Sequence, residues 1–327
     1  MIRFFKLPQP ATLILIPLII LVFWGRMFFS IHPVADQNSL PLWGIAFSFF
    51  NVMPAWINFI ILFILISAEA IYLTILLNKH EVLYKNSFLP ALIFALFISA
   101  LPEFMQLHPI HIVNLLVLRI FDRALTLYKN ELNQKALFDA SFLSGVTALI
   151  YFPCIVMLPF LMIIYAILLP FRLKEWLIMI IGFVLPAFFL STYLFWNYSL
   201  GTFWSMYMEL FKNIHPEIIF KSGTSLLALS SCIGLLLLFS LIKLRANYRK
   251  NVIRTRIYQQ VFFIFLLMGG IFIILSEKIS IIHFSFLIIP LSVFCAYFFL
   301  STRRRIWIYE TTLWGIIAMI IWNNFIN

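Results

Sequence analysis

Residues Ile60 to Leu77 read IILFILISAEAIYLTILL, a run of 18 residues with a single charged side chain, Glu69. A run of this length and composition is long enough to cross the hydrocarbon core of a bilayer as an α-helix. Pro54 precedes it, and the polar group Asn78-Lys79-His80-Glu81 follows it. The sequence therefore predicts a membrane helix over about 54–77.

The rest of the chain repeats this pattern. Of its 327 residues, 64% are hydrophobic and 11% are charged, whereas an ordinary soluble domain carries about 25% charged residues. This composition excludes a soluble enzyme, a disordered protein and a disulfide-stapled module. Eleven spans of about 20 residues would use roughly 220 residues. We therefore expect an all-α fold, a polytopic transmembrane helical bundle of about 11 spans (10–12), with residues 1–327 as a single integral membrane domain and no soluble domain.

The predicted helices include one retained N-terminal helix and a hairpin that turns at Tyr151-Phe152-Pro153. The hairpin is either two full spans or a re-entrant pair buried in protein. Short interfacial helices are expected in the outer loops, with the amphipathic stretch Leu42 to Phe50 as one example. The predicted helices cover about 11–28, 54–77, 87–101, a segment from His111 to Lys135, 138–152, 154–171, 176–196, 225–242, 257–275, 280–300 and 306–323.

Positive charge alternates between the connections. With the N-terminus in the cytoplasm, 19 of the 23 Lys and Arg residues fall on the cytoplasmic side, including the basic run Lys243 to Arg256. Cytoplasmic loops of membrane proteins collect Lys and Arg in this way. The chain is therefore predicted to be a multi-pass protein of the bacterial inner membrane with membrane lipids as partners. Charges scattered in short clusters, rather than along one face of a domain, indicate no nucleic-acid partner.

Groups that exchange protons near neutral pH are concentrated on the predicted outer side. Five of the six histidines lie there, as do five carboxylates that include Asp36 and Glu103. Either these groups form a reaction centre or binding cavity at the outer boundary, or they are solvated loop residues. The histidines are His32, His108, His111, His215 and His283.

His108 and His111 have an i, i+3 spacing that can place both rings on one face of a helical turn. A metal site needs a third and a fourth ligand, and Glu103 is the nearest candidate. Pro109 interrupts the turn and no other ligand spacing follows, so we expect neither a metal nor a cofactor. A polar helix N-terminus is the alternative interpretation.

Two charged positions lie inside predicted helices. Glu69 is about 12 Å from the cytoplasmic end of its helix, where an ionisable side chain is costly unless it is paired, neutral or hydrated. It is either a functional binding residue or a protonated acid bonded to a neighbouring helix. Arg119 and Asp122 are three residues apart and can pair, either as an interfacial ion pair or as part of a clamp for a phosphate.

Several stretches resemble an uncharacterised family of bacterial polytopic inner-membrane proteins, for which no activity is established. The similarity covers most of the chain. The stretches are Leu89-Pro-Ala-Leu, Phe138-Asp-Ala-Ser-Phe-Leu-Ser-Gly145, Tyr151-Phe-Pro153 and Arg172-Leu-Lys-Glu-Trp176, with Gly182 and Pro186.

A more distant, topological resemblance is to the polyprenyl-phosphate-sugar-dependent (GT-C) glycosyltransferases, which have an acidic residue soon after the first helix and interfacial helices in the first outer loop. Asp36 and Leu42 to Phe50 occupy those places, although Asp36-Gln37 replaces the usual paired acids. The resemblance implies a lipid-linked sugar as substrate on the outer face. Asp36 would then be the catalytic base, oriented by Glu103 or by a nearby histidine such as His108 or His111.

The same resemblance implies that a cationic side chain binds the lipid phosphate, and the candidates are Arg26, Lys212 and Lys221. Two other functions stay open. The protein is alternatively a non-catalytic membrane subunit of an export or envelope-assembly complex, with a membrane-protein partner. It is otherwise a carrier for a lipid-linked or small anionic substrate, in which Glu69 would titrate.

Overall fold

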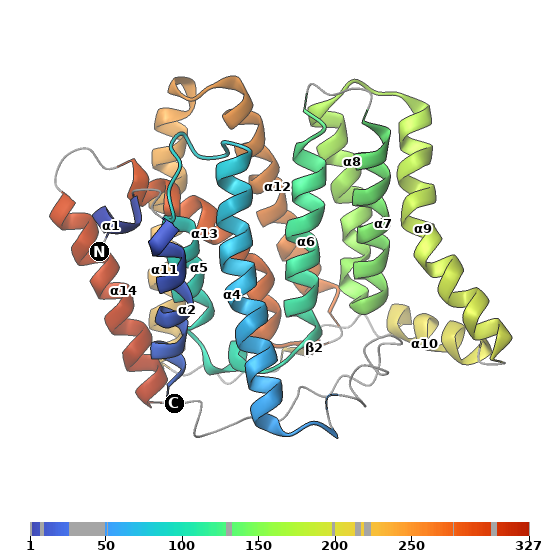
Figure 1. The fold of residues 1–327 in the computed structure, drawn as a ribbon, viewed down its shortest axis with the longest axis horizontal. Coiled ribbons are helices and arrows are strands. Elements are labelled where there is room, and N and C mark those ends of the chain that lie inside the picture. The colour runs from blue at the N-terminus through green and yellow to red at the C-terminus, as the bar shows by residue number, and fades with distance from the viewer. Residues whose placement is uncertain are drawn as a thin grey trace.

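The computed structural model describes residues 2–6, 10–25, 50, 52–128, 133–197, 200–212, 217–218, 224–276, 278–301 and 306–326. Within these ranges the chain forms a bundle of helices (Figure 1). The described secondary structure is helical except for two strands of two residues each, β1 (Glu217–Ile218) and β2 (Lys278–Ile279), which pair in parallel. The predicted helical fold class is confirmed.

The helices have the following bounds. Short 3-10 helices are η1 (Pro102–Met105), η2 (Phe152–Val156), η3 (Tyr248–Lys250) and η4 (Ile281–Phe284). The α-helices of the described part are α1 (Ile2–Lys6), α2 (Pro10–Trp24), α4 (Ala55–Lys79), α5 (Leu89–Ile98), α6 (Pro109–Leu125), α7 (Gln134–Ile150), α8 (Met157–Leu168), α9 (Leu173–Trp196), α10 (Leu200–Lys212), α11 (Thr224–Asn247), α12 (Ile253–Ile274), α13 (Ser285–Leu300) and α14 (Ile306–Ile326).

Several helices are long and apolar enough to cross a membrane. Within the described residues there are six such segments, which are Ala55–Lys79, Leu173–Trp196, Ser225–Lys250, Ile253–Ile274, Ile281–Leu300 and Ile306–Asn324. Shorter apolar helices cover Thr12–Trp24, Leu89–Ile98 and Phe152–Leu168. These helices support a membrane-embedded protein, and the number of about eleven spans stays a prediction.

The sequence-based prediction was wrong at the end of α6. The helix predicted to reach Lys135 ends at Leu125, where Thr126 Oγ1 donates a hydrogen bond to the carbonyl of Arg123 at 2.6 Å. A new helix then begins after Asn133, whose Oδ1 accepts the amide of Ala136 at 3.1 Å. Side chains that bond the nearby backbone offer it an alternative to a continued helix. The two predicted helices therefore remain two, but the first ends at Leu125 instead of Lys135 and the second begins at Gln134 instead of about 138.

Helix α5 is also shorter than the predicted 87–101. Its ten residues are all buried and rise only about 15 Å, half of a hydrocarbon core of about 30 Å. Beyond its end, the carbonyls of Ser99 and Ala100 accept hydrogen bonds from the side-chain amides of Asn324 and Asn323 at 2.9 and 3.0 Å. Non-helical backbone at membrane depth is tolerated where protein satisfies its polar groups, and α14 satisfies them here.

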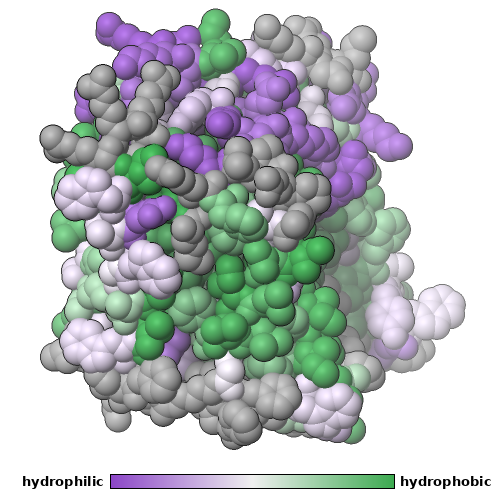
Figure 2. All heavy atoms as spheres, turned by 60° about the vertical axis from the view of Figure 1, so that its left-hand side comes forward, coloured by the Kyte–Doolittle hydropathy of each residue, from purple (hydrophilic) through white to green (hydrophobic). Residues whose placement is uncertain are grey.

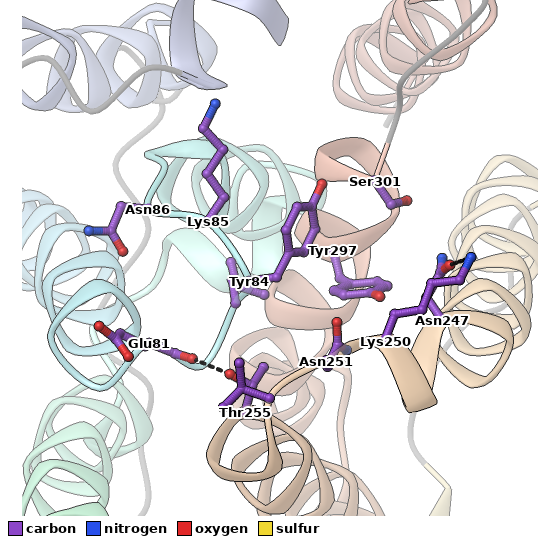
Figure 3. Close-up of a pocket in the computed structure, with 12 residues that line it drawn as sticks. Glu81, Tyr84, Lys85, Asn86, Asn247, Lys250, Asn251, Thr255, Tyr297 and Ser301 are labelled. Atoms are coloured by element: carbon purple, nitrogen blue, oxygen red, sulfur yellow. Dashed lines mark hydrogen bonds between the residues drawn. The ribbon is translucent and has the colours of Figure 1, made fainter.

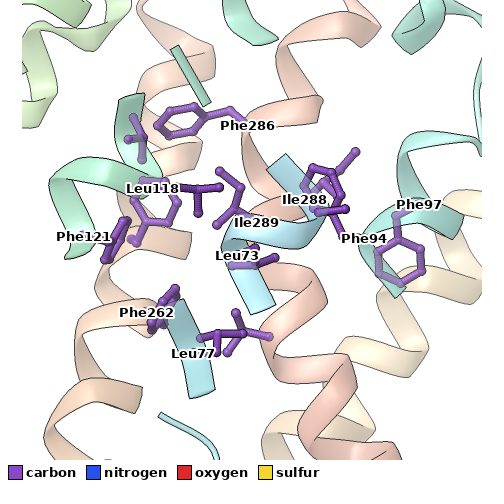
Figure 4. Packing of buried hydrophobic residues seen from close by; sticks show 14 of the residues in the cluster. Leu73, Leu77, Phe94, Phe97, Leu118, Phe121, Phe262, Phe286, Ile288 and Ile289 are labelled. Atoms are coloured by element: carbon purple, nitrogen blue, oxygen red, sulfur yellow. The ribbon is translucent and has the colours of Figure 1, made fainter. Parts of the chain in front are cut away.

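The core lies where α4, α5, α6, α12 and α13 meet (Figure 4). Aromatic rings interlock there: Phe121 stacks on Phe262 with ring centroids 4.9 Å apart, and Phe272 stacks on Phe286 at 4.1 Å. Helices in a membrane associate through van der Waals packing of this kind rather than through the hydrophobic effect. The labelled core residues are Leu73, Leu77, Phe94, Phe97, Leu118, Phe121, Phe262, Phe286, Ile288 and Ile289.

Helices α7 and α9 pack through two glycines. A Cβ atom on Gly145 would collide with the carbonyl oxygen of Phe183, and one on Gly182 would lie 2.9 Å from the Cβ of Ser141. Small residues allow such close approach of helix backbones in membranes. The hairpin predicted around Tyr151 is present, and its legs α7 and α8 run beside α6 (Figure 1).

The two ends of the bundle differ in polarity. One end, which we call the basic end, holds the α4–α5, α6–α7, α8–α9 and α11–α12 connections (Figure 1). Figure 2 shows hydrophilic surface at this end above a hydrophobic band. The other end, the opposite end, holds the α5–α6 and α7–α8 connections and the crosswise helix α10. Which end faces the cytoplasm stays a prediction. Of the expected interfacial stretch Leu42 to Phe50, residues 42–49 lie outside the described part of the chain.

Candidate functional site

Glu69 lies inside α4, about 15 Å along the helix from Lys79, and its side chain is fully buried. The carboxyl group therefore faces protein rather than lipid. His111, in the first turn of α6, places Nδ1 at 3.9 Å from Glu69 Oε1. That distance is too long for a hydrogen bond, but it is short enough for a strong interaction between charges.

The polar atoms around Glu69 are poorly satisfied. Asn114 lies beside Glu69, one turn beyond His111 on α6, and both residues are fully buried. Within the described part of the chain, the two carboxyl oxygens of Glu69, the two ring nitrogens of His111 and the two polar amide atoms of Asn114 make no hydrogen bond of normal geometry. An unpaired buried polar group costs about 1–3 kcal/mol, so native proteins keep few of them. Such atoms, gathered in one place, are available to a proton or a polar ligand.

A second polar group, which contains His108, Tyr151 and His283, lies next to Glu69, His111 and Asn114. His108 caps the N-terminus of α6 and accepts the amide of Ile110 on Nδ1 at 3.1 Å. Because Nδ1 is an acceptor, a neutral His108 carries its proton on Nε2. Tyr151 Oη and His283 Nδ1 are hydrogen-bonded at 2.6 Å. The His108 ring lies edge-on to both of their rings, with centroids 5.7 Å from Tyr151 and 5.8 Å from His283.

These side chains form one group, which we call the buried histidine cluster. His108 is within electrostatic range of both His111 and His283, so it connects the two halves. All members are buried, and four separate parts of the fold supply them: α4, the start of α6, the turn between α7 and η2, and η4. The cluster consists of Glu69, His108, His111, Asn114, Tyr151 and His283.

The structure brings together three of the site residues predicted from sequence, Glu69, His108 and His111. Glu103 lies half-buried in η1, in the connection that leads into α6, and its Oε2 makes no hydrogen bond in the described part of the chain. Lys212 is exposed at the end of α10.

The remaining predicted site residues, Arg26, Asp36 and Lys221, lie outside the described residues. Sequence reasoning missed Tyr151 and His283 as members of the cluster. Tyr151 was noticed only as the apex of a hairpin, and His283 only as one of the outer histidines. Both were predicted to lie at the outer end, but nothing in the sequence shows which turns adjoin.

No metal site is evident in the part of the chain that the structure describes, where no group of three or more His, Cys, Asp or Glu side chains is placed to hold an ion. The three cysteines, Cys154, Cys232 and Cys295, form no disulfide. The side chains of the cluster, which are imidazole, carboxyl, amide and phenol groups, are suited to acid–base chemistry.

A different polar group lies at the basic end. Asp122 contacts three basic side chains, Lys79 Nζ at 2.7 Å, His80 Nε2 at 2.8 Å and Arg119 Nη1 at 3.0 Å. The predicted pairing of Arg119 with Asp122 is confirmed. Burial lowers the pKa of His80 below its usual 6.5, although the hydrogen bond to Asp122 acts in the other direction. Since Arg119 is engaged by Asp122 and by the hydroxyl of Tyr72 at 3.4 Å, this group favours an interfacial ion pair over a phosphate clamp.

Comparison with known proteins identifies the chain only at the level of a family. No curated protein and no solved structure matches it. A family model described as "Family of unknown function (DUF6427)" matches residues 40–327, which is most of the chain and includes every member of the buried histidine cluster. The uncharacterised family expected from the sequence agrees with this match. The chain belongs to this family of unknown function, DUF6427.

Proposed function

We propose that this protein is a membrane carrier that couples the movement of a small anionic substrate to protons, with Glu69 and His111 as the proton-exchanging pair. The observation that carries the proposal is the 3.9 Å separation of two fully buried ionisable groups, neither of which has a hydrogen bond of normal geometry in the described part of the chain. Ionisable residues within membrane helices are rare, and they typically line substrate paths or proton relays.

The chemistry of the pair links proton movement to an anion. When Glu69 holds the shared proton both groups are neutral, and transfer to His111 breaks the O–H bond, forms an N–H bond and leaves an ion pair of zero net charge. A second proton places an acid beside an imidazolium, with a net charge of +1. Uncompensated charge inside a membrane is costly, so an anion that enters with the second proton stabilises this state.

A route for the proton runs through the rest of the cluster. His108 presents a protonated Nε2 that makes no hydrogen bond in the described part of the chain, and its ring lies between His111 and the bonded pair of Tyr151 and His283. Imidazole and phenol groups accept and release protons in turn, which suits a relay. Tyr151 and His283 belong to connections near the opposite end of the bundle (Figure 1), so the relay leads toward that surface.

Titration of Glu69 itself is the direct test. Acidifying the protein in lipid from about pH 8 to about pH 5 crosses the usual pKa of imidazole, about 6.5. It is expected to change a carboxyl C=O band in the difference infrared spectrum, because uptake of a second proton turns the Glu69–His111 ion pair into a neutral acid beside an imidazolium. Glu69→Gln removes that band, whereas Asp139→Asn, a carboxylate change at the basic end next to Arg123, retains it. A spectrum that is the same in the parent and in Glu69→Gln would reject the proton-exchanging pair.

A transferase is the second candidate function, and a groove favours it. An apolar groove of about 420 Å³ lies between α5, α11 and α13. It is lined mainly by hydrophobic side chains, such as those of Phe97, Leu226 and Ile288. Ile281 and Phe284 also line the groove and flank His283 in η4. A hydrocarbon tail fits these walls, so a polyprenyl-phosphate-linked sugar could be held with its head group near the cluster.

In that mechanism Asp36 takes a proton from the acceptor hydroxyl, Glu103 orients it, and Arg26, Lys212 or Lys221 binds the lipid phosphate. Asp36→Asn is then expected to abolish sugar transfer from a defined lipid-linked donor, because an amide cannot act as a base. Transfer at the parental rate by this variant would reject the mechanism. Loss of transfer in Asp36→Asn, together with unchanged infrared titration of Glu69→Gln, would favour the transferase over the carrier.

A further inference from the structure

A polar cavity lies at the basic end of the bundle, distant along α4 from Glu69. It has a volume of about 650 Å³, which is within the range of small-molecule sites, about 300–1,000 Å³. Its walls come from three places: the connection after α4, the connection between α11 and α12, and the end of α13 (Figure 3). Because each wall lies at or just beyond the end of a candidate span, the cavity sits at the level where lipid head groups meet water.

The cavity is lined by cationic and amide side chains. Lys85 and Lys250 belong to different walls, and Asn86, Asn247 and Asn251 lie beside them (Figure 3). Within the described residues neither lysine pairs with a carboxylate, and Lys250 Nζ donates only a long hydrogen bond, 3.4 Å, to Asn247 Oδ1. The positive charge of both lysines is therefore available to a ligand.

Further cations reinforce this positive region. Lys85 and Lys243 both lie close enough to Lys6 to interact with it electrostatically. Burial, followed by the charges of Lys85 and Lys243, lowers the pKa of Lys6. The carboxylate in the wall, Glu81, is offset by Arg254, whose Nη1 lies 3.9 Å from Glu81 Oε2. The net charge around the opening is positive.

The cavity walls are held in place before any ligand binds. Tyr84 Oη donates to the carbonyl of Leu300 at 2.5 Å, which fixes the connection after α4 to the end of α13. Thr255 Oγ1 donates to the carbonyl of Glu81 at 3.0 Å, which fixes the same connection to the start of α12 (Figure 3). A pre-formed site loses less entropy on binding.

We propose that this cavity binds a phosphate group at the membrane surface, with Lys85 and Lys250 neutralising its charge and the Asn86 amide donating a hydrogen bond. Ammonium groups are suited to phosphate as mobile point charges. The phosphate belongs either to an anionic phospholipid or to a soluble phosphate compound, since both carry the same recognised group. The site is separate from the buried histidine cluster and does not depend on the carrier proposal.

Lipid binding measured by native mass spectrometry tests the proposal, with phosphatidic acid as the anionic probe and phosphatidylcholine as the reference. Two surface lysines contribute about 1 kcal/mol each, so Lys85→Gln/Lys250→Gln is expected to weaken phosphatidic acid binding about 30-fold. Lys174→Gln/Arg245→Gln removes the same charge from exposed positions outside the cavity and is expected to bind like the parent. Lys85→Arg/Lys250→Arg is expected to restore binding.

Inorganic phosphate distinguishes the two sources. If inorganic phosphate displaces phosphatidic acid from the parent, a free phosphate group is sufficient for binding. If inorganic phosphate does not displace the lipid, and Lys85→Gln/Lys250→Gln still binds phosphatidic acid more weakly than the parent, the site requires a phospholipid. Equal binding of phosphatidic acid by the cavity variant and by its control would overturn the proposal. A parent protein that binds neither probe would also overturn it. Both substituted lysines are exposed, so the variants are expected to fold, which the melting temperature verifies.

Discussion

Two buried carboxylates, Asp122 in α6 and Glu69 in α4, have opposite surroundings. Asp122 is 5% exposed and Glu69 is 0% exposed, so burial does not distinguish them. Glu69 lies 3.9 Å from one imidazole and makes no hydrogen bond of normal geometry within the described part of the chain. Asp122 is within hydrogen-bond distance of three basic groups, on Lys79, His80 and Arg119.

The partners of Asp122 suit a structural role. The side chains of Lys79 and Arg119 are 53% and 44% exposed, so they bring solvated charge to Asp122 and hold the ends of α4 and α6 together. Such a complete set of partners stabilises one arrangement of the helices. Glu69 lacks these partners, so a change in its protonation disturbs few existing contacts, as expected for a group that changes state during function.

The largest expected effect is on Asp122. Removing one partner of a buried ion pair costs about 3–5 kcal/mol, and because Lys79 and Arg119 retain contact with water we expect Asp122→Ala to lose about 2–3 kcal/mol. Thermal unfolding in mild detergent measures the loss. Asp139→Ala is the matched control, since its partner Arg123 is 3.7 Å away and its own side chain is 30% exposed. Equal melting temperatures for the two variants would show that Asp122 stabilises the fold no more than the partly exposed carboxylate of Asp139 does.

A smaller effect is expected at Tyr151, the hydrogen-bonded member of the buried histidine cluster. Tyr151→Phe removes the hydroxyl that bonds His283 Nδ1 at 2.6 Å, and the loss of such a buried bond costs about 1–2 kcal/mol. The ring packing against Phe272 is retained. The same melting experiment checks it, with Tyr193→Phe, an exposed position, as the control. An unchanged melting temperature in Tyr151→Phe would indicate that this bond does not hold the turns together.

The sequence predicts those features that depend on residues close together in the chain, and it misses those that depend on contacts between distant residues. Long apolar helices and the Arg119–Asp122 pair are local patterns, and the described part of the structure contains them. The break between α6 and α7 was predicted too late in the chain, because Thr126 and Asn133 act through side-chain bonds to the backbone, which hydrophobicity does not reveal. The helix α5 was predicted, but its early end at Ile98 was missed for a similar reason, since that end is stabilised by two asparagines more than 220 residues away.

The candidate site shows the same limit. The sequence identified Glu69 from the cost of a charge in an apolar helix, and it identified His108 and His111 from their spacing. It gave no indication that His283, 175 residues after His108, lies 5.8 Å from it between ring centroids. That contact depends on the packing of η4 against the connection before α6. The cavity around Lys85 and Lys250 also brings together connections that are distant in sequence, and for this region the sequence predicted only a cytoplasmic basic connection and membrane lipids as partners.

Substitution of Glu69 is expected to affect stability less than either change above. Because its oxygens make no hydrogen bond of normal geometry in the described part of the chain, both Glu69→Gln and Glu69→Leu are expected to stay within about 1 kcal/mol of the parent. Proton-coupled transport is nevertheless expected to be lost in both, because neither side chain titrates. Melting curves distinguish a titrating Glu69 from a Glu69 that serves only to bond a neighbouring helix. A marked loss of stability in Glu69→Leu but not in Glu69→Gln would indicate the structural bond.

The smallest expected effect is a pH dependence from His80, beside Asp122. Burial lowers the pKa of His80 below 6.5, so the folded protein binds this proton less readily than the unfolded chain. The contribution of neutral His80 to stability is therefore present above about pH 6.5 and is lost as the pH falls through that value. Melting temperatures of the parent and of His80→Gln, compared between about pH 7.5 and about pH 5.5, isolate this residue because the two proteins share every other titrating group.

The parent is expected to lose more stability on acidification than His80→Gln, and parallel curves would show that His80 does not titrate differently in the two states. Asp122 sharpens the comparison further. Its carboxylate, 2.8 Å from His80 Nε2, favours the protonated ring and opposes the effect of burial. In an Asp122→Ala background that opposition is gone, so the pKa of His80 in the folded protein falls further and the difference between His80 and His80→Gln on acidification increases. A smaller difference in that background would mean that a group other than Asp122 controls the protonation of His80, with Lys79 and Arg254 as the charges near it.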